Sequence, residues 1–182
     1  FNKIAQPEAD ELLITGKGAN GQCRLLLSAS ASLPLIYFTS KNKPSPMTAP
    51  NFCMLLRKHI GSARISSISQ PEMERVVEFE LEHLNEMGDP CKKRLIMEIM
   101  GKHSNIIFCK QDGTIIDSIK HVSAQMSSVR EVLPGRSYFI PETQEKLNPL
   151  MVSKEDFITA VKGKPFPLGK AIYTSFTGIS PI

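Results

Sequence analysis

The sequence has no tryptophan, only four cysteines and no long apolar run. No stretch approaches the roughly 18 apolar residues that a membrane-spanning helix needs, so we expect no membrane span. Cys23, Cys53, Cys91 and Cys109 are far apart, which excludes zinc-type spacing, and too few for a disulfide scaffold. We therefore expect buried free thiols, no bound metal and no cofactor.

What the chain does contain is an ordinary globular balance of residues. Of its 182 residues, 41% are apolar and 22% are charged, with a formal net charge of +4. This composition argues against disorder, collagen and coiled coil, and the length suits one domain with a small appendage. The mild positive charge neither demands nor excludes nucleic acid. Because the chain begins with Phe1 rather than Met, we expect it to be a piece of a longer protein.

Part of the first half of the chain is repeated in the second half. Residues 4–10 (IAQPEAD) resemble residues 68–74 (ISQPEME). After each copy come an apolar run, a glycine-bearing turn and a second apolar run that begins at Arg24 or Arg94. Two copies are too few for a solenoid. They predict two similar β-hairpins packed face to face, which is an antiparallel two-sheet β-sandwich.

Helical patterns lie between the two copies and near the C-terminal end. Residues 52–60 carry apolar side chains at helical spacing, with Thr48 as the expected cap and Gly61 as the end. Ser153 is expected to cap a second helix, and a short one follows at 168–176. The predicted fold class is therefore α+β. We divide it into a β-sandwich domain at residues 1–150 and a helical extension at residues 151–182.

Acidic side chains gather in one segment of the chain. Residues 66–90 hold seven of them and a single base, Arg75, which leaves the rest of the chain basic. One interpretation is a basic surface that contacts RNA beside one acidic strand face. The other is a solvated strand face whose acids pair across strands with Lys92 and Lys93.

No motif for catalysis stands out. The chain has no phosphate loop, zinc-protease motif or nucleophile elbow. Asp117, Lys120 and His121 could be drawn as an acid–base group, but no nucleophile accompanies them. We therefore expect no catalytic residue and no enzymatic activity.

Two segments are candidate binding sites. In the turn at residues 101–105, Lys102 and His103 are candidate contacts to RNA phosphates, and the alternative is a purely structural turn. Arg75 stands where the first copy of the repeat has Glu11. It either pairs with a neighbouring acid, Glu72 or Glu74, or displays its guanidinium to a nucleobase or phosphate.

Five segments together resemble one protein family, NFACT, whose members include fibronectin-binding protein A, RqcH and NEMF. The resemblance is to the N-terminal domain, NFACT-N, and it covers essentially the whole chain in order. The segments are 49–60 (APNFCMLLRKHI), 98–107 (EIMGKHSNII), 116–122 (IDSIKHV), 130–135 (REVLPG) and 176–181 (FTGISP).

The resemblance implies a fold and a function. The fold would be similar to the N-terminal domain of formamidopyrimidine-DNA glycosylases, leading at the C-terminal end into a helix-hairpin-helix region. Family members bind the large ribosomal subunit with stalled peptidyl-tRNA and recruit alanyl-tRNA, and the nascent chain receives a C-terminal alanine tail. This implies tRNA and ribosomal RNA as partners and a cytoplasmic, ribosome-associated location.

The resemblance also implies a tRNA site and leaves an alternative open. An Asp-Arg pair serves tRNA recruitment in relatives and matches Glu74-Arg75 here, so the carboxylate stands one methylene further out. The older family name implies a different function, a surface adhesin that binds fibronectin or extracellular matrix and has a cell-surface fraction.

Overall fold

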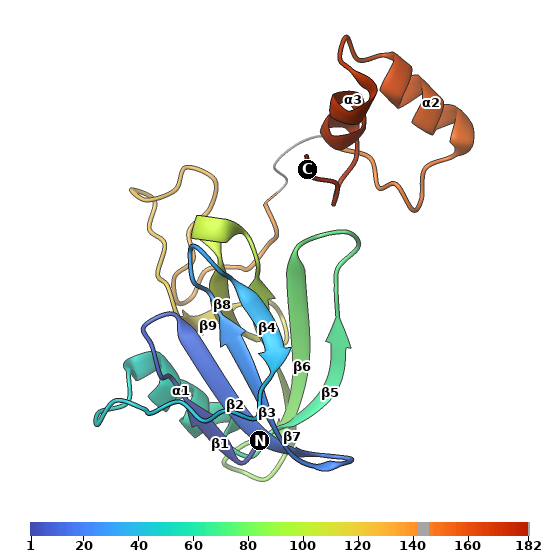
Figure 1. Cartoon of the computed structure of the whole chain (residues 1–182). Coiled ribbons are helices and arrows are strands. Elements are labelled where there is room, and N and C mark those ends of the chain that lie inside the picture. Colours follow the sequence, from blue (N-terminus) through green and yellow to red (C-terminus); the bar gives the residue numbers. More distant parts are fainter. Residues whose placement is uncertain (142–145, 182) are drawn as a thin grey trace. The chain divides into compact units, whose positions relative to one another are not determined.

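The computed structural model describes residues 1–141 and 146–181, and contacts group the chain into two compact units (Figure 1). The first unit comprises residues 1–69 and 76–139. The second unit joins the short segment 70–75 to the described residues of 140–182. The domain boundary that the sequence predicts at residue 150 stays a prediction.

The first unit is built on two antiparallel sheets, which confirms the predicted two-sheet α+β fold (Figure 1). Strands that are neighbours in a sheet are also neighbours along the chain, in the orders β1-β2-β3-β4 and β5-β6-β7-β8-β9. The first sheet comprises β1 (Lys3–Ala5), β2 (Glu11–Gly18), β3 (Gly21–Ser28) and β4 (Leu35–Phe38). The second comprises β5 (Arg64–Ser69), β6 (Val76–Leu84), β7 (Pro90–Glu98), β8 (Asn105–Lys110) and β9 (Ile115–Ser118).

The two copies of the repeat occupy equivalent places in the two sheets. The first copy begins in β1 and continues through β2 and β3, and the second begins in β5 and continues through β6 and β7. In each copy the Gln-Pro-Glu segment is the turn between the first two strands. The predicted relation between the halves is therefore confirmed at the level of strand order.

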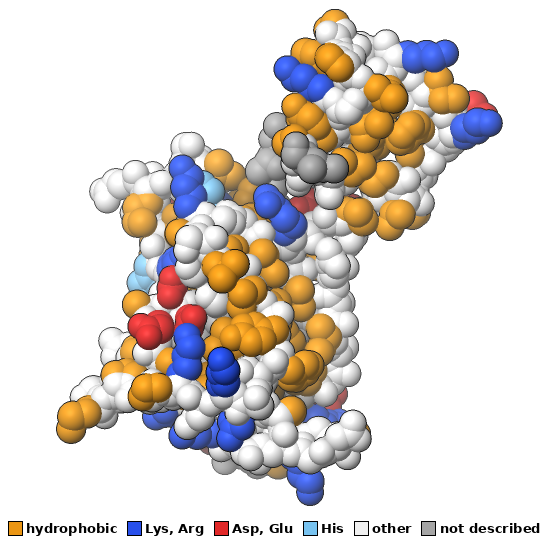
Figure 2. Space-filling view, viewed as in Figure 1, with side chains coloured by type: hydrophobic (Ala, Val, Ile, Leu, Met, Phe, Trp, Pro, Cys, Tyr) orange, Lys and Arg blue, Asp and Glu red, His pale blue; other side chains and the backbone are white. Residues whose placement is uncertain are grey.

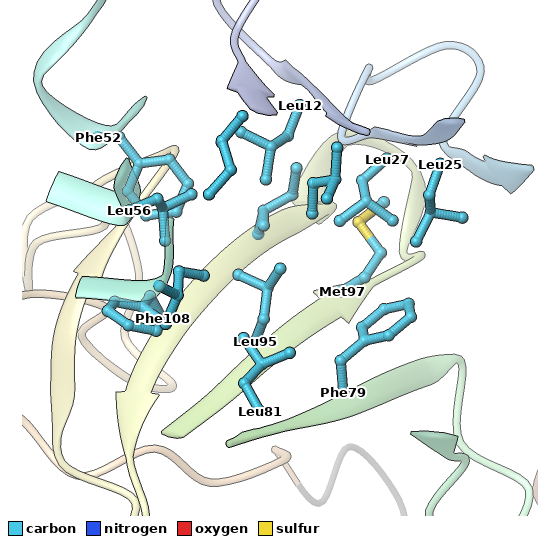
Figure 3. Packing of buried hydrophobic residues seen from close by; sticks show 14 of the residues in the cluster. Leu12, Leu25, Leu27, Phe52, Leu56, Phe79, Leu81, Leu95, Met97 and Phe108 are labelled. Carbon is cyan, nitrogen blue, oxygen red and sulfur yellow. The ribbon is translucent and has the colours of Figure 1, made fainter. Parts of the chain in front are cut away.

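One apolar core joins both sheets and the helix between them (Figure 3). The inner face of the first sheet supplies Leu12 and Leu27, and the second sheet supplies Leu81, Leu95 and Phe108, all fully buried. Side chains alternate between the faces of a strand, so every second residue of these strands enters this core. Burying a leucine or phenylalanine stabilises the fold by about 1.5–3 kcal/mol.

Helix α1 (Asn51–Ile60) closes this core with Phe52, Leu56 and Ile60. Its predicted start is wrong in one respect. Pro50 occupies the N-cap position, at φ −59°, and no side chain caps the helix. Proline has no N–H and its φ is already suited to a helix entrance, so the chain enters the helix without a bond from Thr48. Gly61 ends the helix as expected.

The second unit contains α2 (Lys154–Lys162) and α3 (Leu168–Ser175). Ser153 caps α2 as predicted, because its hydroxyl accepts the Asp156 N–H at 3.1 Å. Phe157 of α2 stacks on Phe176, with ring centroids 4.6 Å apart. No helix in the described part of the chain has both the length and the apolar character to cross a membrane.

All four cysteines are free thiols, as expected, but only two are buried. Cys53 and Cys109 lie in the interior, and burial raises the pKa of Cys109 to about 12. Cys23 and Cys91 are half-buried.

A buried ion pair joins the segment that contains Arg130 and Tyr138 to the end of β7. Glu98, at the end of β7, has no exposed surface. Arg130 donates to both of its oxygens at 2.5 Å, and the Tyr138 hydroxyl donates to it at 3.0 Å. Burial, with the Glu98 charge, raises the pKa of Tyr138, which therefore stays protonated as a donor. The two resembling segments that contain Glu98 and Arg130 thus meet in one cluster.

Replacing Arg130 with Ala should destabilise the first unit strongly. The Glu98 carboxylate would stay buried without its partner, so we expect the free energy of unfolding to fall by about 3–5 kcal/mol in denaturant titration. Tyr138→Phe is the matched control, since it removes a single hydrogen bond and should cost about 1 kcal/mol. A similar, small loss in both variants would contradict this role of the pair.

Candidate functional site

The segment that carries Glu74 and Arg75 is a tight turn between β5 and β6, held by its own backbone. The Glu74 N–H donates to the Pro71 carbonyl at 3.0 Å, and the Gln70 side-chain amide donates to the Glu74 carbonyl at 2.8 Å. The first copy of the repeat has a related bond, in which the Gln6 amide donates to the carbonyl of Ala9, three residues further on instead of four, at 3.1 Å. Gln70 therefore has a structural role in this turn.

This turn differs from its counterpart in its backbone. Glu72 has φ +46°, and among the described residues it is the one non-glycine residue in the left-handed region. That conformation is unfavourable for a residue with a Cβ, and strain of this kind concentrates at functional sites. It makes the 70–75 turn a candidate for function independently of the resemblance.

Arg75 extends from the end of this turn, directly before the first residue of β6. Its side chain is exposed, whereas Glu74 is half-buried. Within residues 1–141 and 146–181, Arg75 takes part in no ion pair, so the expected alternatives, a pair with Glu72 or with Glu74, are not formed. Its guanidinium can therefore offer its donors to a phosphate or a base edge without first leaving one of those neighbours.

A second contact, within the second unit, supports the 70–75 turn at Met73. Gly178, in the 176–181 segment, has φ +76° and lies against Met73. A Cβ at Gly178 would stand 2.9 Å from Met73 side-chain carbons, closer than carbon atoms approach. Sequence reasoning missed this contact, because no periodicity relates residues over 100 positions apart.

The other candidate contacts, Lys102 and His103, lie in a one-turn 3-10 helix, η1 (Gly101–His103). Both side chains are exposed. The residues after them are buried and structural: the Ser104 hydroxyl accepts the Met100 N–H at 2.8 Å, and Asn105 bonds the backbone of Lys120. The structural interpretation of Ser104 and Asn105 is confirmed, and phosphate contact by Lys102 and His103 stays a prediction.

The acids of β6 are paired across strands, as one of the two interpretations required. Glu78 accepts two hydrogen bonds from Arg94, at 2.5 and 2.7 Å, and Glu80 pairs with Lys92 at 2.9 Å. Glu82 pairs with Arg64 at 2.6 Å. Lys93 was expected to take part, but it contacts His83 instead of a carboxylate.

The acid–base group suggested by Asp117, Lys120 and His121 is only partly assembled. His121 lies 2.6 Å from Asp117, whose same oxygen also accepts the Ser118 N–H. Lys120 points elsewhere and donates to the Ala29 carbonyl. The Asp117 contacts are local to this segment, whereas the Lys120 contact joins it to a residue 91 positions away, and none of them brings in a nucleophile.

We expect Gly178→Ala to loosen the 70–75 turn. The new methyl group would meet Met73 and the backbone would be strained at φ +76°, so the unit should lose about 1–2 kcal/mol of stability. Amide hydrogen exchange in residues 72–75 should accelerate. Gly169→Ala is the matched control: it lies in α3 with open space around it and should be neutral or stabilising. Equal exchange in both variants would contradict the contact.

Comparison with known proteins gives one consistent family. A family model described as "NFACT N-terminal and middle domains" matches residues 1–182. Among curated relatives, the "Rqc2 homolog RqcH" of Bacillus subtilis is 40% identical over 185 residues, covering 100% of this chain. The chain spans 32% of that relative's length, and 28% of the RqcH homologue of Streptococcus pneumoniae, which is also 40% identical.

Solved structures agree with the sequence relatives. The N-terminal domain of fibronectin-binding protein PavA from Streptococcus pneumoniae superposes with a TM-score of 0.86 at 36% identity, covering 98% of this chain and 67% of that one. The fibrinogen binding protein from Staphylococcus aureus gives 0.86 at 30% identity, with 99% and 63% covered. The sequence match and the shared sheets together place this chain in the NFACT family, in its N-terminal part.

Proposed function

We propose that this chain is the tRNA-recruiting, RNA-binding domain of a ribosome quality control factor. The whole protein would bind large ribosomal subunits that carry stalled peptidyl-tRNA and would recruit alanyl-tRNA for C-terminal alanine tailing. The RqcH relative from Bacillus subtilis, which matches the whole length of the chain, supports this proposal.

The observation that carries the proposal is the display of Arg75. Its guanidinium is exposed and forms no ion pair in the described part of the chain. The turn that carries it is held by two internal hydrogen bonds, which also keep Glu72 in the left-handed conformation. A fixed turn limits the conformational entropy lost when RNA binds. Arg is also suited to guanine edges and to phosphates because its five donors form a planar fork.

Glu74 would orient the site or accept a hydrogen bond from RNA. Glu74 is half-buried and directly precedes the exposed Arg75, so its carboxylate would be available to a ligand that binds the guanidinium. Glu in place of the family's Asp keeps the charge and lengthens the side chain by one methylene, which moves the acceptor without removing it.

We propose that the domain works by positioning RNA rather than by catalysis, and in the cytoplasm on ribosomes. Lys102 and His103 would add phosphate contacts from the η1 turn, where both are exposed. Binding of this kind depends on released counterions and should weaken steeply with salt.

A surface adhesin is the second candidate, favoured by one observation. Strand β4 is an edge of the first sheet, and its Phe38 is 71% exposed beside an exposed Tyr37. An open edge with exposed aromatics can accept a strand from a partner such as fibronectin. Finding the native protein on washed cells and absent from ribosomes would favour this function.

Arg75→Ala should reduce tRNA recruitment without removing ribosome binding. An Arg–base contact contributes about 1–3 kcal/mol, so the amount of alanine tRNA that co-purifies should fall by roughly five- to 150-fold. The measurement is sequencing of RNA that co-purifies with the full-length protein from its own cells. Large-subunit RNA should stay at the wild-type level.

Two further variants make this test specific. Lys17→Ala removes one positive charge from an exposed position on the β2–β3 hairpin and should keep tRNA. Glu74→Asp restores the family's residue and should also keep it, whereas Glu74→Ala should not. Equal loss of tRNA and ribosomal RNA in Arg75→Ala would refute a selective role for Arg75.

A further inference from the structure

The inner face of the second sheet changes from apolar to basic toward the β6–β7 turn. Leu81, Leu95 and Phe108 belong to the buried core. One step further along the same face of each strand stand three basic residues, and register places Lys93 opposite Lys110. We call this set the inner basic row: His83 of β6, Lys93 of β7 and Lys110 of β8.

The inner basic row lines an open groove of about 1090 Å³. His59, near the end of α1, lies on it as well, with its ring centroid 6.0 Å from that of Phe108. Four lining residues carry a permanent positive charge and one carries a negative charge, Glu82. The acid is already engaged by Arg64 at 2.6 Å and Lys92 at 3.9 Å. The basic row therefore keeps its charge uncompensated by this carboxylate.

Lys93 and Lys110 are directly opposite each other on adjacent strands, an arrangement that is normally destabilising. The Lys93 side chain contacts a histidine: its ammonium lies 2.8 Å from His83 Nε2. His83 Nδ1 lies 3.0 Å from the Leu84 carbonyl, to which it can only donate, so Nε2 of the neutral ring accepts from Lys93. His83 thus holds Lys93 in place without neutralising it. Two Lys93 N–H groups are left for a ligand.

The surroundings of His59 agree with this arrangement. Burial is the largest cause of its lowered pKa, and the nearby positive charges, Lys93 first, lower that pKa further. Because Lys93 and Lys110 face each other in the groove, positive charge is concentrated there and an added anion would be stabilised.

We propose that this groove is a phosphate-binding site that holds the backbone of an RNA, with Lys93 and Lys110 as contacts and His83 as the residue that positions Lys93. The site is distinct from the Arg75 turn. Arg75 directly precedes Val76 at the start of β6, and seven residues of extended strand, about 23 Å, separate Val76 from His83. The proposal rests on the RNA-binding function proposed above.

An RNA backbone suits the shape and chemistry of the groove. The groove is open, so a chain can cross it, and lysine binds phosphate as a flexible point charge without demanding one orientation. Neighbouring strands lie about 4.8 Å apart, so long side chains on β7 and β8 can reach more than one phosphate of the same strand. No base-reading geometry is present in the row, and such contacts add affinity without sequence choice.

The test is a double variant, Lys93→Gln/Lys110→Gln, in the full-length protein. Binding of large-subunit RNA and of tRNA is measured over a range of salt concentrations. The slope of log affinity against log salt is negative, and each lost phosphate contact makes it less steep by about 0.7–0.9. The slope of the double variant should therefore be less steep by about 1.5. The control Lys17→Gln/Lys41→Gln removes the same charge from exposed positions outside the groove and should change the slope less.

A stability measurement separates binding from folding. The double variant removes two positive charges that face each other. Without ligand, its melting temperature should therefore be equal to or above that of the wild type. Inorganic pyrophosphate should raise the melting temperature of the wild type and not that of the variant. A lower melting temperature with an unchanged salt slope would assign the lysines a structural role and overturn the proposal.

The outcomes also separate this proposal from the function on which it rests. An unchanged salt slope together with loss of tRNA in Arg75→Ala would overturn the groove and keep the proposed function. Absence of RNA from the wild type would refute the RNA ligand and the proposed function together. Stabilisation by pyrophosphate in that case would identify a free phosphate compound as the ligand of the groove.

Discussion

The shared core between the two sheets is the constraint on which the other features depend. Leu12 and Leu27 from one sheet meet Leu81, Leu95 and Phe108 from the other, with α1 closing the space. Because side chains alternate along a strand, this packing also decides which residues face outward. The acids of β6 therefore lie on the outer face, and the inner basic row lies on the inner face, just beyond the end of the core.

Buried polar contacts then specify how the connecting segments lie on this frame. The Glu98–Arg130 pair is stable only if both partners are in place, since an unpaired carboxylate in the interior is costly. Hydrogen bonds within the 70–75 turn and the close fit of Gly178 to Met73 hold the Arg75 turn in a similar way. The candidate site is thus a strained turn with support on two sides, and its exposed Arg75 is available to a ligand.

The two proposed RNA contacts differ in kind. Arg75 is a planar donor on a fixed turn, which suits discrimination between bases or tRNAs. Lys93 and Lys110 are long point charges in an open groove, which suits the backbone alone. A factor that must hold a large RNA and select one tRNA would need both kinds of contact. Arg75 directly precedes β6, whereas Lys93 and Lys110 belong to β7 and β8 and lie beside its other end, at His83.

The sequence by itself determined the elements and their order. The repeat and the Ser153 cap were both confirmed: the repeat in the matching strand order of the two sheets, and the cap because it depends only on neighbouring residues. It also singled out Arg75, since only one copy of the repeat has it. Tertiary structure alone decided that Arg75 forms no ion pair within the described residues and that Lys93 contacts His83, because such contacts depend on which segments become neighbours in space. The meeting of Glu98 with Arg130 and of Met73 with Gly178 joins residues 32 or more positions apart, and only the packed fold brings them together.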